Sequence, residues 1–181
     1  KYMSEQPADR GRDIGKLLFS MEYFFNETYL LPLSHDEVVH GKGTIVNKMA
    51  GDFDTRLQQA RLLYLYMFTH PGKKLNFMGS ELAEFIEWRE YEELEWFMLD
   101  YEPHRKLKDF TRAVNLFYLA HPALWEEDCS PEGFEWISPD DNRNNVVVFL
   151  RKCAEEELIV AVNFSPQRWE NYRFGVPKFG K

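Results

Sequence analysis

The spacing of apolar residues along this chain changes near Pro122. Before that residue, segments with helical spacing alternate with short apolar runs. The first expected helix covers about 13–25. The second begins at a cap of Asp54 or Thr55 and ends at Pro71-Gly72, and the third stops before Pro122. The expected strands are 29–33 and 75–78. The order helix, strand, helix, strand, helix is typical of a parallel α/β sheet.

After Pro122 the pattern is one of short strands about ten residues apart. We expect strands at 134–137, 146–150 and 158–164, separated by the turn-rich segment 138–145 and the charged segment 151–157. This is hairpin patterning, typical of an antiparallel β-sandwich. We therefore predict an α/β domain over 1–122 and an all-β domain over 123–181, with the boundary within 122–130. Three or four strands are too few to cover both faces of a sheet, so we expect the second domain to be partial.

Charge and composition exclude several classes of protein. The chain has 22 Lys and Arg against 30 Asp and Glu, a net charge of −8, which argues against binding to nucleic acid through its phosphates. Its longest apolar run, 62–68, is far shorter than the roughly 20 residues that cross a bilayer, so no membrane association is expected. The two cysteines, Cys129 and Cys153, are too few for a disulfide framework and favour reduced thiols in a cytoplasmic protein.

The densest group of reactive side chains follows the first expected strand. It reads Ser34-His35-Asp36-Glu37-Val38-Val39-His40-Gly41-Lys42 and opens a long loop, 34–52. In parallel α/β folds, active sites gather where strands end, so position and composition both point to this cluster.

Two of the three chemistries that this cluster could serve are poorly matched. Four side chains of the cluster are of types that bind metals: His35, Asp36, Glu37 and His40. The two histidines are five residues apart, which places them about 140° from each other around a helix. The zinc-protease pattern needs two histidines that are four residues apart. The strand that precedes the His-Asp pair also argues against a helical phosphohydrolase. The run 41–44 is similar to the end of a phosphate-binding loop, yet Asp36 stands where that loop needs glycine, and its charge would repel phosphate.

Carbohydrate chemistry is the third chemistry that this cluster could serve. Glycosidic cleavage passes through an oxocarbenium-like transition state that carboxylates stabilise. Asp36 would supply one carboxylate and His35 a hydrogen bond to a sugar hydroxyl, although both could instead serve only to organise the loop. A glycosidase needs a pair of carboxylates, and one is present here. Among the aromatic residues, most of which we expect in the core, Trp88 and Trp96 are the candidates for stacking on sugar.

The segment 31–42 closely resembles part of bacterial-type 1,4-α-glucan (glycogen) branching enzymes, which belong to the α-amylase clan of retaining glycoside hydrolases and transglycosylases. The resemblance continues in the same order through 70–75, 77–81, 87–88, 122–124, 133–137, 163–166 and 172–177. It implies the C-terminal segment of a (β/α)8 TIM barrel followed by the start of an antiparallel β-sandwich domain. One departure is the run 79–83, where these enzymes usually read Gly-Gln-Glu-Phe-Gly.

By this resemblance, Asp36 stabilises the transition state and His35 hydrogen-bonds the distorted sugar, while the nucleophilic Asp and the acid/base Glu lie outside this chain. The enzyme would cleave an α-1,4-glucan and transfer the segment to a 6-hydroxyl, forming an α-1,6 branch without cofactor or metal. The expected partners are α-glucan and the missing N-terminal part of the same enzyme, and exposed sheet edges would promote self-association of an isolated, inactive chain. The alternatives are a non-catalytic glucan-binding module and a metal-dependent hydrolase.

Overall fold

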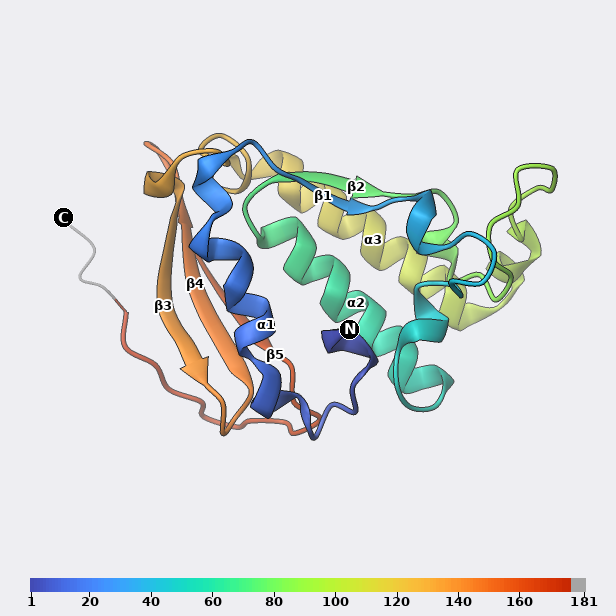
Figure 1. Ribbon diagram of the computed structural model, residues 1–181, viewed down its shortest axis with the longest axis horizontal. Coiled ribbons are helices and arrows are strands. Elements are labelled where there is room, and N and C mark those ends of the chain that lie inside the picture. Colours follow the sequence, from blue (N-terminus) through green and yellow to red (C-terminus); the bar gives the residue numbers. More distant parts are fainter. Residues whose placement is uncertain (177–181) are drawn as a thin grey trace.

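The computed structural model describes residues 1–176 and contains two sheets with helices between and beside them (Figure 1). A three-stranded sheet lies at one end of the molecule, the long helices α2 (Phe53–Thr69) and α3 (Glu102–Ala120) lie across its centre, and long loops form the opposite end. No helix within the described residues is long and apolar enough to cross a membrane.

The predicted parallel pair is present. Strand β1 (Leu30–Leu33) pairs in parallel with β2 (Lys73–Asn76), and α2 connects them. The second strand begins two residues earlier than its apolar run indicated. The helix α2 also begins earlier than predicted: its cap is Asp52, whose carboxylate accepts a hydrogen bond of 2.9 Å from the amide of Thr55, and not Asp54 or Thr55.

The predicted hairpins are also present. Strands β3 (Phe134–Asp141), β4 (Val146–Lys152) and β5 (Glu157–Asn163) form an antiparallel sheet with β4 in the centre. The prediction of a turn over all of 138–145 is wrong, because β3 continues to Asp141 through two register shifts. Such irregularities let a strand with proline and acidic residues stay in the ladder.

One face of this sheet is covered by the beginning of the chain and by α2. Tyr2, Ile14 and Leu17 are buried against Val147, Phe149, Val162 and Phe164, with Leu62 and Tyr66 of α2 at the margin. Within the described residues the segment therefore forms one sheet, and a sandwich of two sheets stays a prediction. The division at 122–130 also stays a prediction.

The expected helix over about 13–25 is wrong in type. The segment contains only one α-helical turn, α1 (Gly15–Leu18), between short 3-10 helices at Arg10–Asp13, Phe19–Glu22 and Phe24–Asn26. Ile14 and Leu17 are nevertheless buried, as their helical spacing predicted, whereas Leu18, Met21 and Phe25, which share that spacing, are half-buried. Residues three apart lie on the same side of a 3-10 helix as well as of an α-helix, so spacing alone does not distinguish the two.

Buried charge joins β4 to the end of α2 and to the segment that follows α3. The guanidinium of Arg151 in β4 is fully buried and bonds the carbonyl oxygens of Thr69, Leu124 and Gly133 at 2.8, 3.1 and 3.2 Å. It also lies 2.8 Å from a carboxylate oxygen of Asp128, whose other oxygen is 3.3 Å from the ammonium of Lys73. We call Arg151, Asp128 and Lys73 the ionic junction.

Candidate functional site

The two parallel strands end at the same edge and place the reactive loop there. Leu33 and Asn76 are register partners at this edge, and the amide of Phe77 continues the pairing with a 2.8 Å bond to the carbonyl of Leu33. His35, Asp36 and Glu37 follow at once as a short 3-10 turn. The cluster therefore lies where the alternation of strands and helices predicted it.

His35 and Asp36 form an exposed polar pair at this edge. The side chains are 54% and 78% exposed, and Nε2 of His35 lies 3.3 Å from Oδ1 of Asp36. The imidazole faces two aromatic rings that pack edge to face: its centroid is 6.0 Å from that of Phe77 and 6.4 Å from that of Trp88. A carboxylate and an imidazole thus stand open to solvent beside an apolar wall.

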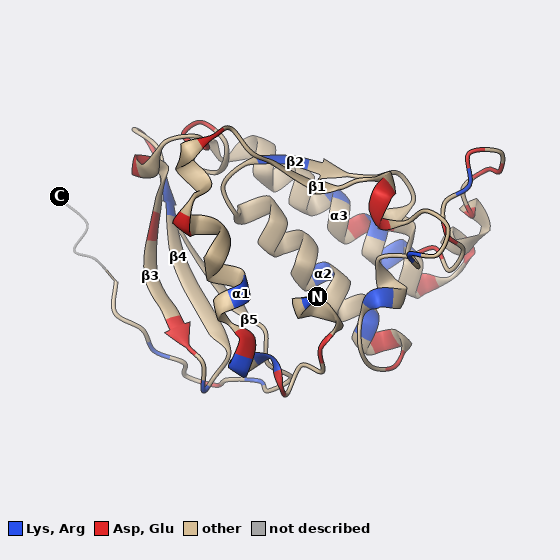
Figure 2. Cartoon of the chain, viewed as in Figure 1, with Lys and Arg blue, Asp and Glu red and all other residues tan. Residues whose placement is uncertain are grey.

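Part of the loop is held by its own buried side chains and by the ion pair of Lys48 with Glu37. Val38, Ile45 and Val46 are buried in the cluster beneath α2. The ammonium of Lys48 lies 2.7 Å from the carboxylate of Glu37 and also bonds its carbonyl oxygen. This hydrogen bond lowers the pKa of the Glu37 carboxyl. Figure 2 shows both signs of charge mixed over the loops at this end of the molecule.

A contact that the sequence did not reveal comes from the loop after β2. The carboxylate of Glu87 accepts hydrogen bonds from the amides of Gly43 and Gly41, at 2.6 and 3.0 Å, and lies 3.6 Å from Nδ1 of His40. The two amides lower the pKa of Glu87. The only sequence signal for this role was the pair Glu87-Trp88 within the branching-enzyme resemblance, because a partner more than 40 residues away leaves no local pattern.

The same loop holds the departure from the usual branching-enzyme motif. Gly79 has φ +88°, and a Cβ there would overlap the carboxylate of Glu84. That carboxylate is buried, which raises its pKa, and it accepts a 2.8 Å bond from the amide of Glu95. Ala83 stands where these enzymes usually carry glycine, yet its φ is +57°, a left-handed conformation that costs an L-residue about 1–2 kcal/mol.

The four metal-ligand types of the loop do not converge. Glu37 faces Lys48 and His40 faces Glu87, whereas His35 and Asp36 pair with each other. In residues 1–176 no three His, Cys, Asp or Glu side chains are placed to hold a metal ion.

The two tryptophans that we singled out as candidates for stacking on sugar differ in their surroundings, since Trp96 is exposed while Trp88 packs against Phe77. The arrangement is suited to hydrogen bonding and apolar contact with a polyhydroxylated ligand.

This chain is similar to known proteins along its whole length. It is 45% identical over 181 residues to the 1,4-alpha-glucan branching enzyme GlgB of Bacillus cereus (strain G9842) and to that of Halothermothrix orenii. The match covers 99% of this chain. The resemblance to branching enzymes is confirmed. The chain spans 28% and 29% of the length of these two relatives.

The β-rich part matches a known domain. Residues 136–181 match the family model of the alpha amylase C-terminal all-beta domain, in agreement with the three strands β3, β4 and β5. Of the residues quoted for the resemblance, Pro177 lies outside the described part of the structure.

Solved structures share the fold at low sequence identity. A Nostoc punctiforme debranching enzyme soaked with acarbose aligns over 83% of this chain and 29% of its own, with a TM-score of 0.56 and 16% identity. A cyclomaltodextrinase aligns over 75% of this chain and 21% of its own, with a TM-score of 0.53 and 20% identity. These likenesses concern the fold alone.

Proposed function

We propose that this chain is part of a 1,4-α-glucan branching enzyme, which cleaves an α-1,4-glucan and transfers the freed segment to a 6-hydroxyl. The observation that carries the proposal is the 45% identity to branching enzymes over 99% of the chain. The exposed pair of His35 and Asp36, at the carboxyl edge of two parallel strands, supports it, because this is where α/β enzymes collect their reactive groups.

Asp36 and His35 have separate roles in the proposed reaction. In a retaining transfer a nucleophilic carboxylate attacks C1 while an acid gives a proton to the departing O4; the incoming 6-hydroxyl then displaces the carboxylate and returns its proton to the same group. These two groups belong to the part of the enzyme outside this chain. The carboxylate of Asp36 stabilises the positive charge that develops at the ring in both steps, and His35 hydrogen-bonds the sugar.

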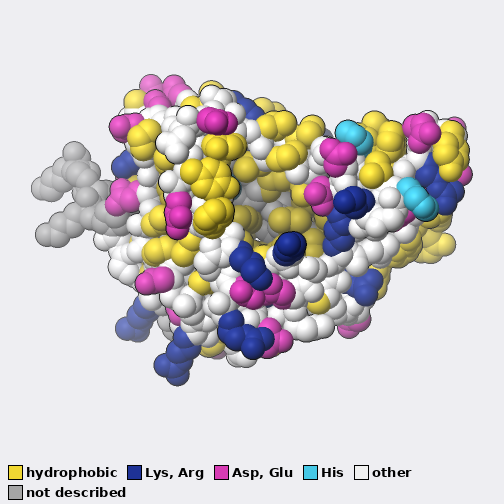
Figure 3. All heavy atoms as spheres, in the orientation of Figure 1, with side chains coloured by type: hydrophobic (Ala, Val, Ile, Leu, Met, Phe, Trp, Pro, Cys, Tyr) yellow, Lys and Arg dark blue, Asp and Glu magenta, His cyan; other side chains and the backbone are white. Residues whose placement is uncertain are grey.

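We also propose that β1 and β2 are two neighbouring strands of a (β/α)8 barrel. Within the described residues β1 pairs with β2 alone, so its other edge is free. Beside it lies an open cavity of about 500 Å³ between the beginning of the chain, β1 and α2, with Leu17, Leu33 and Tyr66 in its lining. Figure 3 shows apolar side chains around a hollow in this face. A preceding strand and the N-terminal part of the enzyme would fill it.

The same proposal includes the division of the chain into domains at 1–122 and 123–181 and a cytoplasmic location. It also includes self-association of the isolated chain through the free edges of β1 and β2. A barrel segment without its neighbours leaves unpaired backbone groups at such edges, which favours pairing between copies.

The experiment is a branching assay on the full-length protein of the open reading frame that contains this chain. Incubation with amylose should lower the iodine absorbance and create α-1,6 linkages, measured as the short chains that a debranching enzyme then releases. Iodine loss without new linkages would indicate hydrolysis and contradict the proposal. Binding to amylose without either change would favour the non-catalytic glucan-binding module.

A further inference from the structure

The loop that carries His35 and Asp36 depends on a second loop for its shape. Short turns link its residues, since the amides of Val38 and Val39 both bond the carbonyl of His35, and the amide of Lys42 bonds the carbonyl of Val39, all at 2.9–3.0 Å. Backbone hydrogen bonds therefore link the segment from His35 to Lys42, and we call this segment the path. A contact at its far end can constrain the backbone of His35 and Asp36.

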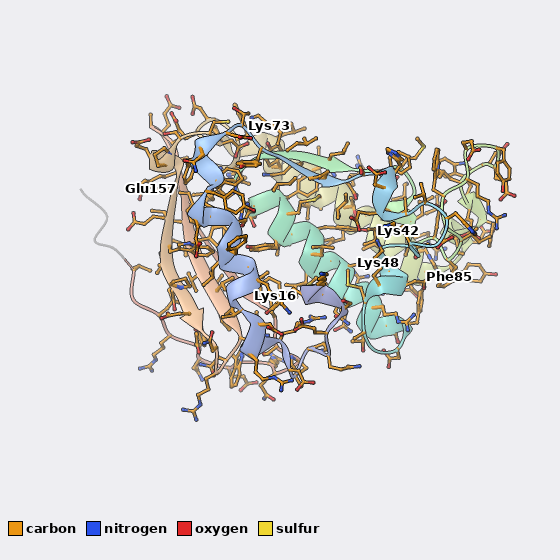
Figure 4. All side chains as sticks on the ribbon, in the orientation of Figure 1. Lys16, Lys42, Lys48, Lys73, Phe85 and Glu157 are labelled. Atoms are coloured by element: carbon orange, nitrogen blue, oxygen red, sulfur yellow. The ribbon has the colours of Figure 1, made fainter. Side chains whose placement is uncertain are left out.

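The loop after β2 contacts this path and the segment that follows it. The amide of Trp88 donates a 2.9 Å bond to the carbonyl of Val38, and the side-chain amide of Asn47 donates a 3.2 Å bond to the carbonyl of Phe85. Figure 4 shows Lys42, Lys48 and Phe85 at the same end of the molecule, on the loops that meet here.

Glu87 is at the centre of this set. One of its carboxylate oxygens accepts the amide of Gly43 at 2.6 Å and the other accepts the amide of Gly41 at 3.0 Å. Both glycines have left-handed backbones, with φ +74° and +81°, and nothing lies within 4 Å of where a Cβ would be. Glycine is thus needed at these positions for conformation and not for space. The resulting pair of inward-facing amides forms an anion-binding concavity that a carboxylate of the chain itself occupies.

We propose that Glu87 is a positioning residue for the reaction, which holds the turn of His35 and Asp36 in place through Gly41 and Gly43. The neighbouring indole of Trp88 completes the arrangement against the imidazole of His35. Glu87 is only 28% exposed, and both of its oxygens are engaged by the loop, so it acts through the loop and not on the sugar. The inference rests on the proposed branching function.

The test compares the variants Glu87→Ala and Glu87→Gln in the full-length protein with a matched control, Glu92→Ala. Glu92 is an exposed carboxylate of the same segment that pairs with Arg89. We expect Glu87→Ala to lower kcat on amylose about 10- to 100-fold with a smaller change in KM, because small displacements of reacting groups slow the chemical step. Glu87→Gln, which keeps an acceptor oxygen, should recover part of kcat, and Glu92→Ala should match the wild type.

Hydrogen exchange gives a readout independent of activity. The amides of Gly41 and Gly43 should exchange faster in Glu87→Ala than in the wild type and in Glu92→Ala, while amides of α2 keep their rates. Unchanged kcat per folded molecule in Glu87→Ala, with or without a lower unfolding temperature, would overturn the positioning role. A wild-type protein that fails to branch amylose would instead contradict the proposed function, and the two failures are thereby distinguished.

Discussion

The molecule uses charge in opposite ways at the ionic junction and at the loop after β1. In the junction, Arg151 and Asp128 are 0% and 1% exposed; Arg151 bonds three carbonyl oxygens and Asp128, and Asp128 also contacts Lys73. At the loop, Asp36 is 78% exposed, and His35 is its only ion-pair partner among the described residues. Buried charges need all of these partners to offset their desolvation, whereas an open carboxylate remains available to a ligand. The comparison separates charge that maintains the fold from charge available for function.

The largest effect on stability is expected from the junction. Asp128→Ala would leave the guanidinium of Arg151 buried without its counter-ion, which costs about 3–5 kcal/mol of unfolding free energy. Urea unfolding of the wild type and of Asp128→Ala measures this loss of unfolding free energy. The control is Glu102→Ala, which removes an exposed helical pair with Lys106 and should cost under about 0.5 kcal/mol. Equal losses in the two variants would contradict the distinction between buried and exposed charge.

A pH titration examines the same region through Lys74. Burial lowers the pKa of the Lys74 ammonium to about 7, although it bonds the carbonyls of His70 and Gly72. Between pH 7 and about 10.5 the unfolded chain holds this proton and the folded chain has released it. The unfolding free energy should therefore rise with pH in this window, by at most about 1.4 kcal/mol per unit.

The matched variants are Lys74→Met and Lys108→Met, the latter at an exposed position of α3. Urea unfolding at several pH values from 7 to 10 should show the slope in the wild type and in Lys108→Met, and a flatter one in Lys74→Met. The same slope in all three proteins would show that Lys74 keeps an ordinary pKa.

A smaller effect, of opposite sign, is expected beside the candidate site. Ala83→Gly relieves the left-handed backbone at φ +57° and should raise the unfolding free energy by about 0.5–1 kcal/mol. Ala113→Gly, on the exposed face of α3, should lower it by about 1 kcal/mol. A loss of stability in both variants would show that the site loop tolerates Ala83 without strain.

Local pattern predicted most of the framework but few of the contacts that fix it. The two parallel strands, both long helices and the three hairpin strands follow from apolar spacing, and their order placed His35 and Asp36 at the strand ends. The broken helix at 13–25 was missed because residues three apart share a face in both helix types.

The bonds that decide the finer structure lie far apart in the sequence. Arg151 bonds the carbonyl of Thr69, 82 residues away, and Glu87 bonds the amide of Gly43, 44 residues away. Nothing near Arg151 distinguishes it from a solvated arginine at the end of a strand. Such partners are determined by the packing of whole elements, so the sequence alone could indicate the candidate residues and not their contacts.

The most direct test of the account compares Asp36→Asn with Asp128→Asn in the full-length protein. Each substitution keeps the shape of the side chain and removes its charge. We predict that Asp36→Asn lowers kcat for amylose branching at least about 100-fold and changes the unfolding free energy by less than about 0.5 kcal/mol. Asp128→Asn should cost several kcal/mol of stability and retain activity in the molecules that stay folded. An Asp36→Asn protein that branches amylose as well as the wild type would contradict the account.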